Sequence, residues 1–343
     1  MRGFCTFVLL SLVLYSDALP VNNGKLQALD PEEHLTTPEI INYWGYPAEE
    51  HDGRQSNKTR PAILFMHGLE ESSSCWVINL PKQSAGFIYA DAGYDVWLGN
   101  VRGNTYSKDH ISLHPKYKEF WQFSWDEMAK YDLPAMFDKI EKVTGQKQIY
   151  YVGHSQGTLI MFAKLASEPT FEKRIKRFFA LAPVAEVKRI KGMLKFLADD
   201  LYPWIFDILP DGEFLPSNWL MKLISDWVCN NFIGEAICDN IIFLIAGPEI
   251  ESLNKTRTAV YTSHAPAGTS VQNMDHWTQT AKIGKMQKFD YRDSKKNQQH
   301  YGQSIPPDYA LTEITGPEIH LYSSKEDYLA DPTRHRRISY SKS

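Results

Sequence analysis

The sequence lacks an excess of charge of either sign, and this absence excludes several kinds of protein. Its 343 residues carry 37 lysines and arginines against 41 aspartates and glutamates, a net charge of −4. A nucleic-acid-binding surface needs clustered basic charge, so no nucleic-acid partner is indicated. Because 43% of the residues are apolar and 23% charged, the chain is neither disordered nor collagen-like, and it can bury a sizeable core.

Long apolar runs are also scarce. Residues 4–15 form a short one that contains only two polar residues, follows Arg2 and precedes Ser16 and Ala18. A basic start, a short apolar run and a small-x-small exit are typical of a secretory signal peptide, and the run is too short to span a bilayer. We therefore predict a signal peptide over residues 1–18. The mature chain is then expected to have no transmembrane segment and to be secreted or lysosomal.

Cysteine is rare, with four in the chain, of which one lies in the predicted signal peptide. Cys229 and Cys238 lie close together within an apolar stretch, which suits a local disulfide in an oxidising compartment. Cys75 is left over and is expected to be a free buried thiol. N-glycosylation sequons at Asn57 and Asn254 agree with secretion.

No repeat or low-complexity tract interrupts the chain. In its middle half, short β-branched or aromatic runs alternate with helical patterns, which predicts a parallel sheet with crossover helices. A capping box, Ser124-x-x-Glu127, predicts a helix that begins there and ends near Gly145. The predicted strands are Ala62–Met66, Tyr94–Leu98, Gln148–Val152, Phe178–Leu181 and Glu318–Tyr322.

Residues 185–308 break this alternation. Their pattern is mostly helical, and they separate two predicted strands of one sheet. We therefore expect an inserted cap domain over the carboxyl ends of the strands. The core domain would then comprise residues 19–184 and 309–332.

The motif Gly153-His154-Ser155-Gln156-Gly157 has the pattern Gly-x-Ser-x-Gly. It follows a predicted strand and precedes a helical pattern over Thr158–Ala166, which is the context of a nucleophile elbow. A serine on a strained turn needs neighbours without side chains, so that strand and helix can approach and the hydroxyl can project. Ser155 is the candidate nucleophile. The alternative is a glycine-rich turn that carries a solvated serine.

A second motif, His67-Gly68-Leu69, follows the predicted strand Ala62–Met66. In an α/β-hydrolase the oxyanion hole takes one backbone N–H from the residue after the nucleophile and one from the loop after an earlier strand. The amides of Gln156 and Leu69 fill these positions. Alone, the second motif indicates only a tight turn. Its pairing with the nucleophile elbow is what favours a role in the oxyanion hole.

The triad order of this fold predicts an acid after a later strand. Glu326 and Asp327 both follow the predicted strand Glu318–Tyr322, and spacing alone does not choose between them. Asp331 precedes Pro332 and fits a helix N-cap with proline at the first helical position.

On these and longer segments the chain resembles the acid lipase family of α/β-hydrolases, the group of gastric lipase and lysosomal acid lipase. The resemblance covers most of residues 30–332. Its segments are Glu39–Pro47, Ala90–Asn100, Arg102–Thr105, Asp126–Pro134, Tyr150–Thr158, Ala180–Pro183, Ala265–Asn273 and His276-Trp277.

The resemblance implies hydrolysis of neutral-lipid esters, triacylglycerols or steryl esters, at a lipid–water interface without a metal or organic cofactor. It implies Ser155 as nucleophile, Asp327 rather than Glu326 as acid, and a cap disulfide between Cys229 and Cys238. It also implies a lid. An apolar helix face fits a lid, or equally the core of the cap, and is formed by Leu220, Leu223, Ile224 and Trp227.

The sequence departs from the family pattern in three places. A further β-hairpin of the family is missing between Glu50 and Arg60, and Asp275 stands where the pattern is apolar. The catalytic histidine, about thirty residues beyond the acid in the family, is also missing. His335 lies in a basic tail at 333–343 and is expected to be solvated. We therefore expect a shortened form with little turnover, with a non-catalytic lipid-binding or decoy protein as the alternative.

Overall fold

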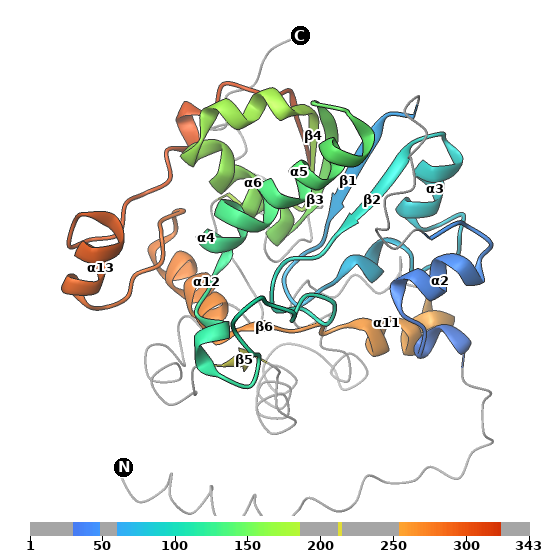
Figure 1. Ribbon diagram of the computed structural model, residues 1–343, viewed down its shortest axis with the longest axis horizontal. Helices are drawn as coiled ribbons and strands as arrows, with labels where there is room; N and C mark the ends of the chain where they lie inside the picture. The colour runs from blue at the N-terminus through green and yellow to red at the C-terminus, as the bar shows by residue number, and fades with distance from the viewer. Residues whose placement is uncertain (1–29, 49–59, 186–211, 215–253, 324–343) are drawn as a thin grey trace, which may run out of the picture. The chain divides into compact units, whose positions relative to one another are not determined.

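The computed structural model describes residues 30–48, 60–185, 212–214 and 254–323 (Figure 1). Its main element is a five-stranded parallel sheet with the strand order β2-β1-β3-β4-β7. All five predicted strands are confirmed, with ends that differ by at most three residues. The strands are β1 Ala62–Met66, β2 Asp95–Gly99, β3 Ile149–His154, β4 Ile175–Leu181 and β7 Ile319–Tyr322.

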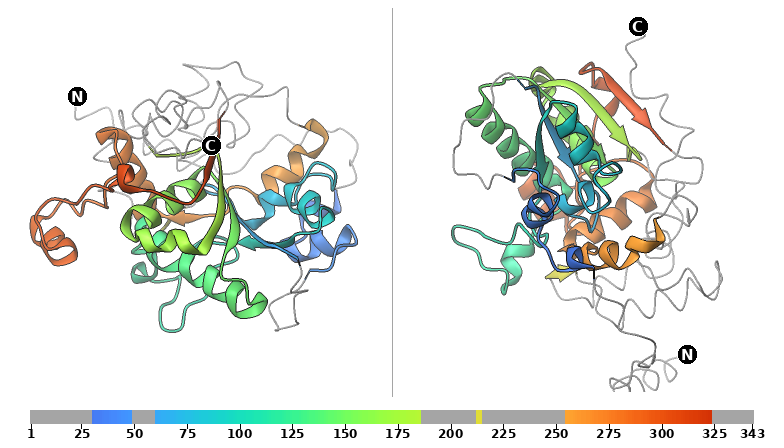
Figure 2. Two further views of the ribbon diagram at one scale, coloured as in Figure 1. Left: turned by 90° about the horizontal axis from the view of Figure 1, so that it is seen from above. Right: turned by 90° about the vertical axis from the view of Figure 1, so that its right-hand side faces the viewer.

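Helices cover both faces of the sheet (Figure 2). The side chains of β1 alternate between two hydrophobic clusters and are buried throughout, as expected for a central parallel strand. Leu64 faces the cluster that contains residues of α5 and α6, and Phe65 packs on Trp76 on the other face. The helices are α2 Thr37–Tyr43, α3 Ala85–Asp91, α4 Trp125–Glu127, α5 Leu133–Thr144, α6 Gln156–Ser167, α11 Thr258–His264, α12 Val271–Ile283 and α13 Ser294–Tyr301.

The predicted capping box begins α4. Ser124 Oγ accepts the Asp126 amide at 3.2 Å, and Glu127 Oε2 accepts the Ser124 amide at 2.8 Å. One π-helical segment, Met128–Asp132, joins α4 to α5. The helical stretch ends at Gly145 with φ of +72°, so the predicted start and end are both confirmed.

The described part of residues 185–308 contains α11, α12, α13 and a two-stranded antiparallel pair, β5 Glu213–Phe214 with β6 Thr269–Ser270. The predicted cap domain remains a prediction. None of the described helices is long and apolar enough to cross a membrane. The predicted signal peptide, Cys229 and Cys238, Asn57, the apolar face at 220–227 and residues 324–343 lie outside the described residues.

A buried ion pair fastens the start of α11 to the N-terminal part of the described chain. Arg257 and Glu32 have side chains that are 5% and 2% exposed, with Nη2–Oε2 at 2.6 Å and Nη1–Oε1 at 3.1 Å. The same guanidinium donates to the Ile78 carbonyl, and Trp44 Nε1 donates to Glu32. Three chain segments therefore depend on one cation.

Arg257→Met is expected to lower the free energy of unfolding by about 3 kcal/mol, because it leaves the Glu32 carboxylate buried without its cation. Urea unfolding measures this loss. The matched control is Arg177→Met, which breaks the exposed pair of Arg177 with Glu318 and should cost less than about 1 kcal/mol. Equal losses in the two variants would contradict the role of the buried pair.

Candidate active site

Ser155 occupies the turn between β3 and α6, as the motif predicts. Its backbone has φ of +48° and ψ of −113°, a region that residues with side chains rarely adopt. A Cβ atom on Gly153 would lie 2.9 Å from the Gly157 carbonyl carbon, and one on Gly157 would lie 2.6 Å from the Met66 carbonyl oxygen. Both glycines are therefore required by close backbone packing around a strained serine.

The loop after β1 lies directly beside this turn. A Cβ atom on Gly68 would lie 3.2 Å from Ser155 Cβ and 2.8 Å from Glu71 Oε2. Among the described residues, the backbone amides of Leu69 and Gln156 donate to no protein acceptor. The structure thus brings Ser155 together with the two loops that carry the predicted oxyanion donors.

His67 orients the peptide that carries the Leu69 amide. Its Nε2 accepts the Val101 amide at 3.2 Å, so the ring proton lies on Nδ1 and is donated to the Gly68 carbonyl at 2.8 Å. In a trans peptide the Leu69 N–H points away from that carbonyl. Burial lowers the pKa of His67, which favours the neutral ring. The sequence indicated only a turn at His67 and did not predict this role.

His67→Leu is expected to lower kcat for a soluble ester by about 10²-fold with little change in KM, because a misdirected Leu69 amide stabilises the transition state less. Steady-state kinetics on a short-chain chromogenic ester measure the change. His300→Leu on the exposed side of α13 is the control and should keep kcat. An unchanged kcat in His67→Leu would show that the ring does not set the donor.

Glu71 holds the other end of the same loop. Its Oε2 accepts the Gly68 amide at 2.6 Å and pairs with His154 Nδ1 at 3.0 Å. Burial alone would raise the pKa of Glu71, but the charge of His154 and these hydrogen bonds lower it to about 2.

Cys75 is a free thiol, as predicted, but is half-buried rather than buried. Burial and the nearby Glu71 carboxylate raise its pKa.

Glu70 is a buried acid next to Leu69 that sequence reasoning missed. It has φ of +58° and is 4% exposed. Its carbonyl accepts the Ala267 amide at 2.7 Å, its Oε2 accepts the Gly268 amide at 3.1 Å, and its Oε1 has no partner. The nearby cation Lys108 is 2.6 Å from Glu213. Burial raises the pKa of Glu70 to about 8, so the side chain is neutral in acid.

The side chain of Gln156 ties the elbow to α12. Its Oε1 accepts Trp277 Nε1 at 2.6 Å and Asn273 Nδ2 at 2.9 Å. His276 stacks on Trp125 of α4, with ring centroids 4.0 Å apart. Residues of the predicted cap region therefore pack directly on the residue after Ser155.

Asp275, the polar residue at an apolar position of the family pattern, is 4% exposed on α12. It forms an ion pair with Arg292, which has φ of +52°. A buried carboxylate needs such a cation, so Arg292 explains how α12 tolerates this residue.

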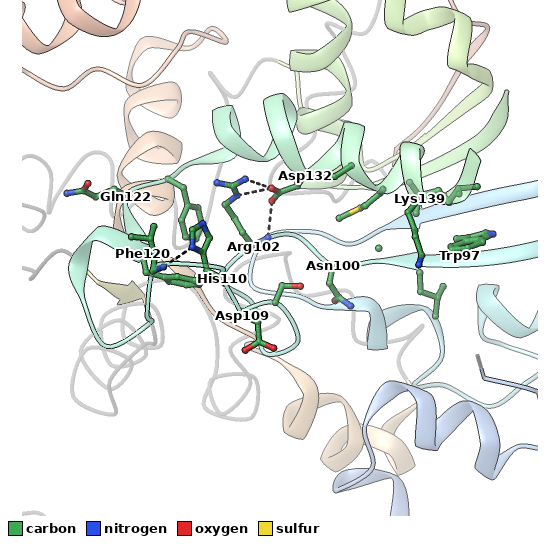
Figure 3. Close-up of a pocket in the computed structure, with 18 of the residues that line it drawn as sticks. Trp97, Asn100, Arg102, Asp109, His110, Phe120, Gln122, Asp132 and Lys139 are labelled. Atoms are coloured by element: carbon green, nitrogen blue, oxygen red, sulfur yellow. Dashed lines mark hydrogen bonds and ion pairs between the residues drawn. The ribbon is translucent and has the colours of Figure 1, made fainter. Parts of the chain in front are cut away.

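An open pocket of about 580 Å³ lies between β2, α5 and the chain after β2 (Figure 3). Trp97 and Lys139 line one end and Phe120 and Gln122 the other, with the ion pair of Arg102 and Asp132, at 2.5 Å, between them. Ser155 is not among its lining residues. Among the described residues, no group of three histidine, cysteine or carboxylate side chains is arranged to hold a metal ion.

The remaining predicted residues fall mostly outside the described chain. Glu326 and Asp327, the two candidate acids, are not described, and neither are the cysteines of the predicted disulfide. Asn254 of the second sequon is described and accepts the Thr256 hydroxyl at 2.8 Å.

Comparison with known proteins gives consistent matches. The family described as "alpha/beta hydrolase fold" matches residues 61–213. Lipase lipl-1 of Caenorhabditis elegans is 50% identical over 89% of this chain and 81% of its own length. The human lysosomal acid lipase/cholesteryl ester hydrolase is 45% identical over 93% of this chain and 85% of its own. Human gastric triacylglycerol lipase is 45% identical over 90% and 82%.

Proposed function

This chain belongs to the acid lipase family of α/β-hydrolases, and from that membership we propose that it is a serine carboxylic-ester hydrolase of neutral lipids. Relatives named as a cholesteryl ester hydrolase and a triacylglycerol lipase support steryl esters and triacylglycerols as the substrate classes. The observation that carries the proposal is Ser155 on its strained turn, beside two backbone amides that have no acceptor in the part of the chain that the structure describes.

In the proposed mechanism Ser155 attacks the ester carbonyl, and the Leu69 and Gln156 amides bind the oxyanion that develops. Preorganised donors of this kind lower the barrier by about 3 kcal/mol each. Asp327 is proposed to orient the histidine base of the triad, a role to which no histidine of this sequence is assigned. His67 does not serve as the base, because its two ring nitrogens already bond to Gly68 and Val101.

Covalent labelling tests this proposal. A fluorophosphonate probe should form an adduct that mass spectrometry maps to the peptide with Ser155, and emulsions of triolein and cholesteryl oleate should report which ester class is hydrolysed. Binding of lipid without an adduct at Ser155 would favour the alternative, a non-catalytic lipid-binding protein.

We also propose a secreted or lysosomal location, with glycans on Asn57 and Asn254 and a Cys229–Cys238 disulfide. Two relatives are named as a lysosomal and a gastric lipase, which supports a lysosomal or secreted location. Glycosidase digestion of protein from the culture medium should shift its mass for both glycans. Free thiol at both Cys229 and Cys238 in that material would overturn the disulfide.

A further inference from the structure

The chain between β2 and the 3₁₀ helix η3, Lys118–Trp121, exposes apolar side chains. We call residues 108–118 the tip loop. Ile111 is 101% exposed, Tyr117 60% and Leu113 39%. Of the ten large apolar side chains exposed in the described chain, these three lie within seven residues of sequence. Exposed apolar side chains that gather in one segment are typical of interaction surfaces, whereas single ones are common on any protein.

The tip loop is held in a defined shape. His110 Nδ1 accepts the amides of Ser112 at 3.1 Å and Leu113 at 2.8 Å, and His114 Nδ1 accepts the Lys116 amide at 3.1 Å. Trp121 Nε1 donates to the Pro115 carbonyl at 2.7 Å. The apolar side chains are therefore presented by an ordered loop, of which Asp109, His110 and Leu113 also line the pocket of Figure 3.

Cations flank this apolar cluster. Lys116 and Lys118 are exposed, and neither has an ion-pair partner among the described residues. Residues 106–120 carry three lysines against two carboxylates, a net charge of +1, whereas the whole chain carries −4. Exposed apolar residues beside lysines are typical of segments that bind at the surface of an anionic lipid layer.

The chain just before the tip loop is connected, through Ala267, to residues 67–71 after β1, which we call the oxyanion loop. The Thr105 amide donates to the Ala267 carbonyl at 2.8 Å, and the Ala267 amide donates to the carbonyl of Glu70 at 2.7 Å. Lys108, at the start of the loop, pairs with Glu213 of β5. The chain at the start of the tip loop is therefore linked to the segment that carries Leu69 and Glu70.

We propose that the tip loop is a lipid-docking element that inserts Ile111, Leu113 and Tyr117 into a phospholipid surface while Lys116 and Lys118 contact its anionic headgroups. This inference rests on the proposed function for its purpose, because a lipase must reach substrate at an interface. It concerns binding and not the ester chemistry.

Vesicle sedimentation with the full chain tests the proposal, using phosphatidylcholine vesicles with and without phosphatidylserine. The double variant I111S/L113S should bind both at least about tenfold more weakly, because its two apolar side chains no longer enter the layer. The matched control is I305S. Ile305 is 67% exposed but lies outside the tip loop, so its substitution should leave vesicle binding unchanged. K116Q/K118Q should weaken binding only to the vesicles with phosphatidylserine.

A separate reporter keeps insertion distinct from folding and from catalysis. In I111W the added indole should shift its fluorescence to shorter wavelength when vesicles are added. Unchanged vesicle binding in I111S/L113S, an equal loss in I305S, or a vesicle-independent dimer that I111S/L113S abolishes would each overturn the proposal. Fluorophosphonate labelling of Ser155 in soluble I111S/L113S should persist. If the wild-type chain is not labelled at Ser155, that result counts against the proposed function and not against the lipid-docking element.

Discussion

Glycine in place of Ser155 is expected to abolish covalent labelling and ester hydrolysis while raising the free energy of unfolding by about 1 kcal/mol. The serine adopts φ of +48° and ψ of −113°, where a Cβ atom is strained by about 1–3 kcal/mol. Glycine removes that strain from the folded state. Because glycine also raises the conformational entropy of the unfolded chain, part of this stabilisation is lost. The nucleophile site is thus predicted to be more stable without its nucleophile.

Ser155→Ala separates the two effects. It removes the hydroxyl but keeps Cβ, so it should abolish covalent labelling, as Ser155→Gly does, without the gain in stability. Fluorophosphonate labelling and urea unfolding of the three proteins measure both quantities. If Ser155→Ala and Ser155→Gly unfold at the same urea concentration, the turn is not strained by its side chain. If either variant is still labelled, Ser155 is not the nucleophile.

The sheet and the elbow could be predicted because their signals are local. A buried strand such as Ala62–Met66 reads as a short apolar run, and Gly153 and Gly157 stand at fixed spacing around Ser155. Close backbone packing at the elbow tolerates no other residue type, so the motif carries its geometry in the sequence. The same holds for the capping box at Ser124, whose partner is three residues away.

The residues that orient the site could not be predicted because their partners are distant in sequence. His67 depends on Val101, and Glu70 on Ala267 and Gly268, contacts that exist only after the loops have packed. Asp275 is a similar case. Its departure from the apolar pattern is visible in the sequence. The cation that pairs with it, Arg292, follows 17 residues later in a left-handed backbone conformation, and no sequence motif predicts this pairing.

Glu70 is expected to make the free energy of unfolding depend strongly on pH. Burial raises the pKa of Glu70 from 4.5 to about 8 in the folded chain. Between these values the folded protein binds more protons than the unfolded one, so stability falls as pH rises, by about 1.4 kcal/mol per unit. Glu70→Gln cannot ionise. It should match the wild-type protein near pH 4.5 and exceed its free energy of unfolding by up to about 5 kcal/mol at pH 8.

Urea unfolding of both proteins from pH 4.5 to 8 measures this difference. The difference is needed because His67 acts in the opposite direction: its lowered pKa removes stability as pH falls below the unfolded value of 6.5. Glu313→Gln, an exposed carboxylate, is the control and should follow the wild-type curve. A difference for Glu70→Gln that does not change with pH would mean that folding does not raise the pKa of Glu70.

The neighbours of Glu70 allow a sharper test of the cause. Glu213 raises its pKa and Lys108 lowers it, and these two side chains form an ion pair with each other. Glu213→Gln should therefore move the pH at which stability levels off to a lower value, and Lys108→Met should move it to a higher one. Shifts in opposite directions require a titrating carboxyl that senses both charges, whereas loss of the ion pair alone would affect the two variants alike. Because Glu70 bonds to Ala267 and Gly268 beside the Leu69 amide, the same ionisation should loosen the predicted oxyanion loop before the rest of the chain unfolds.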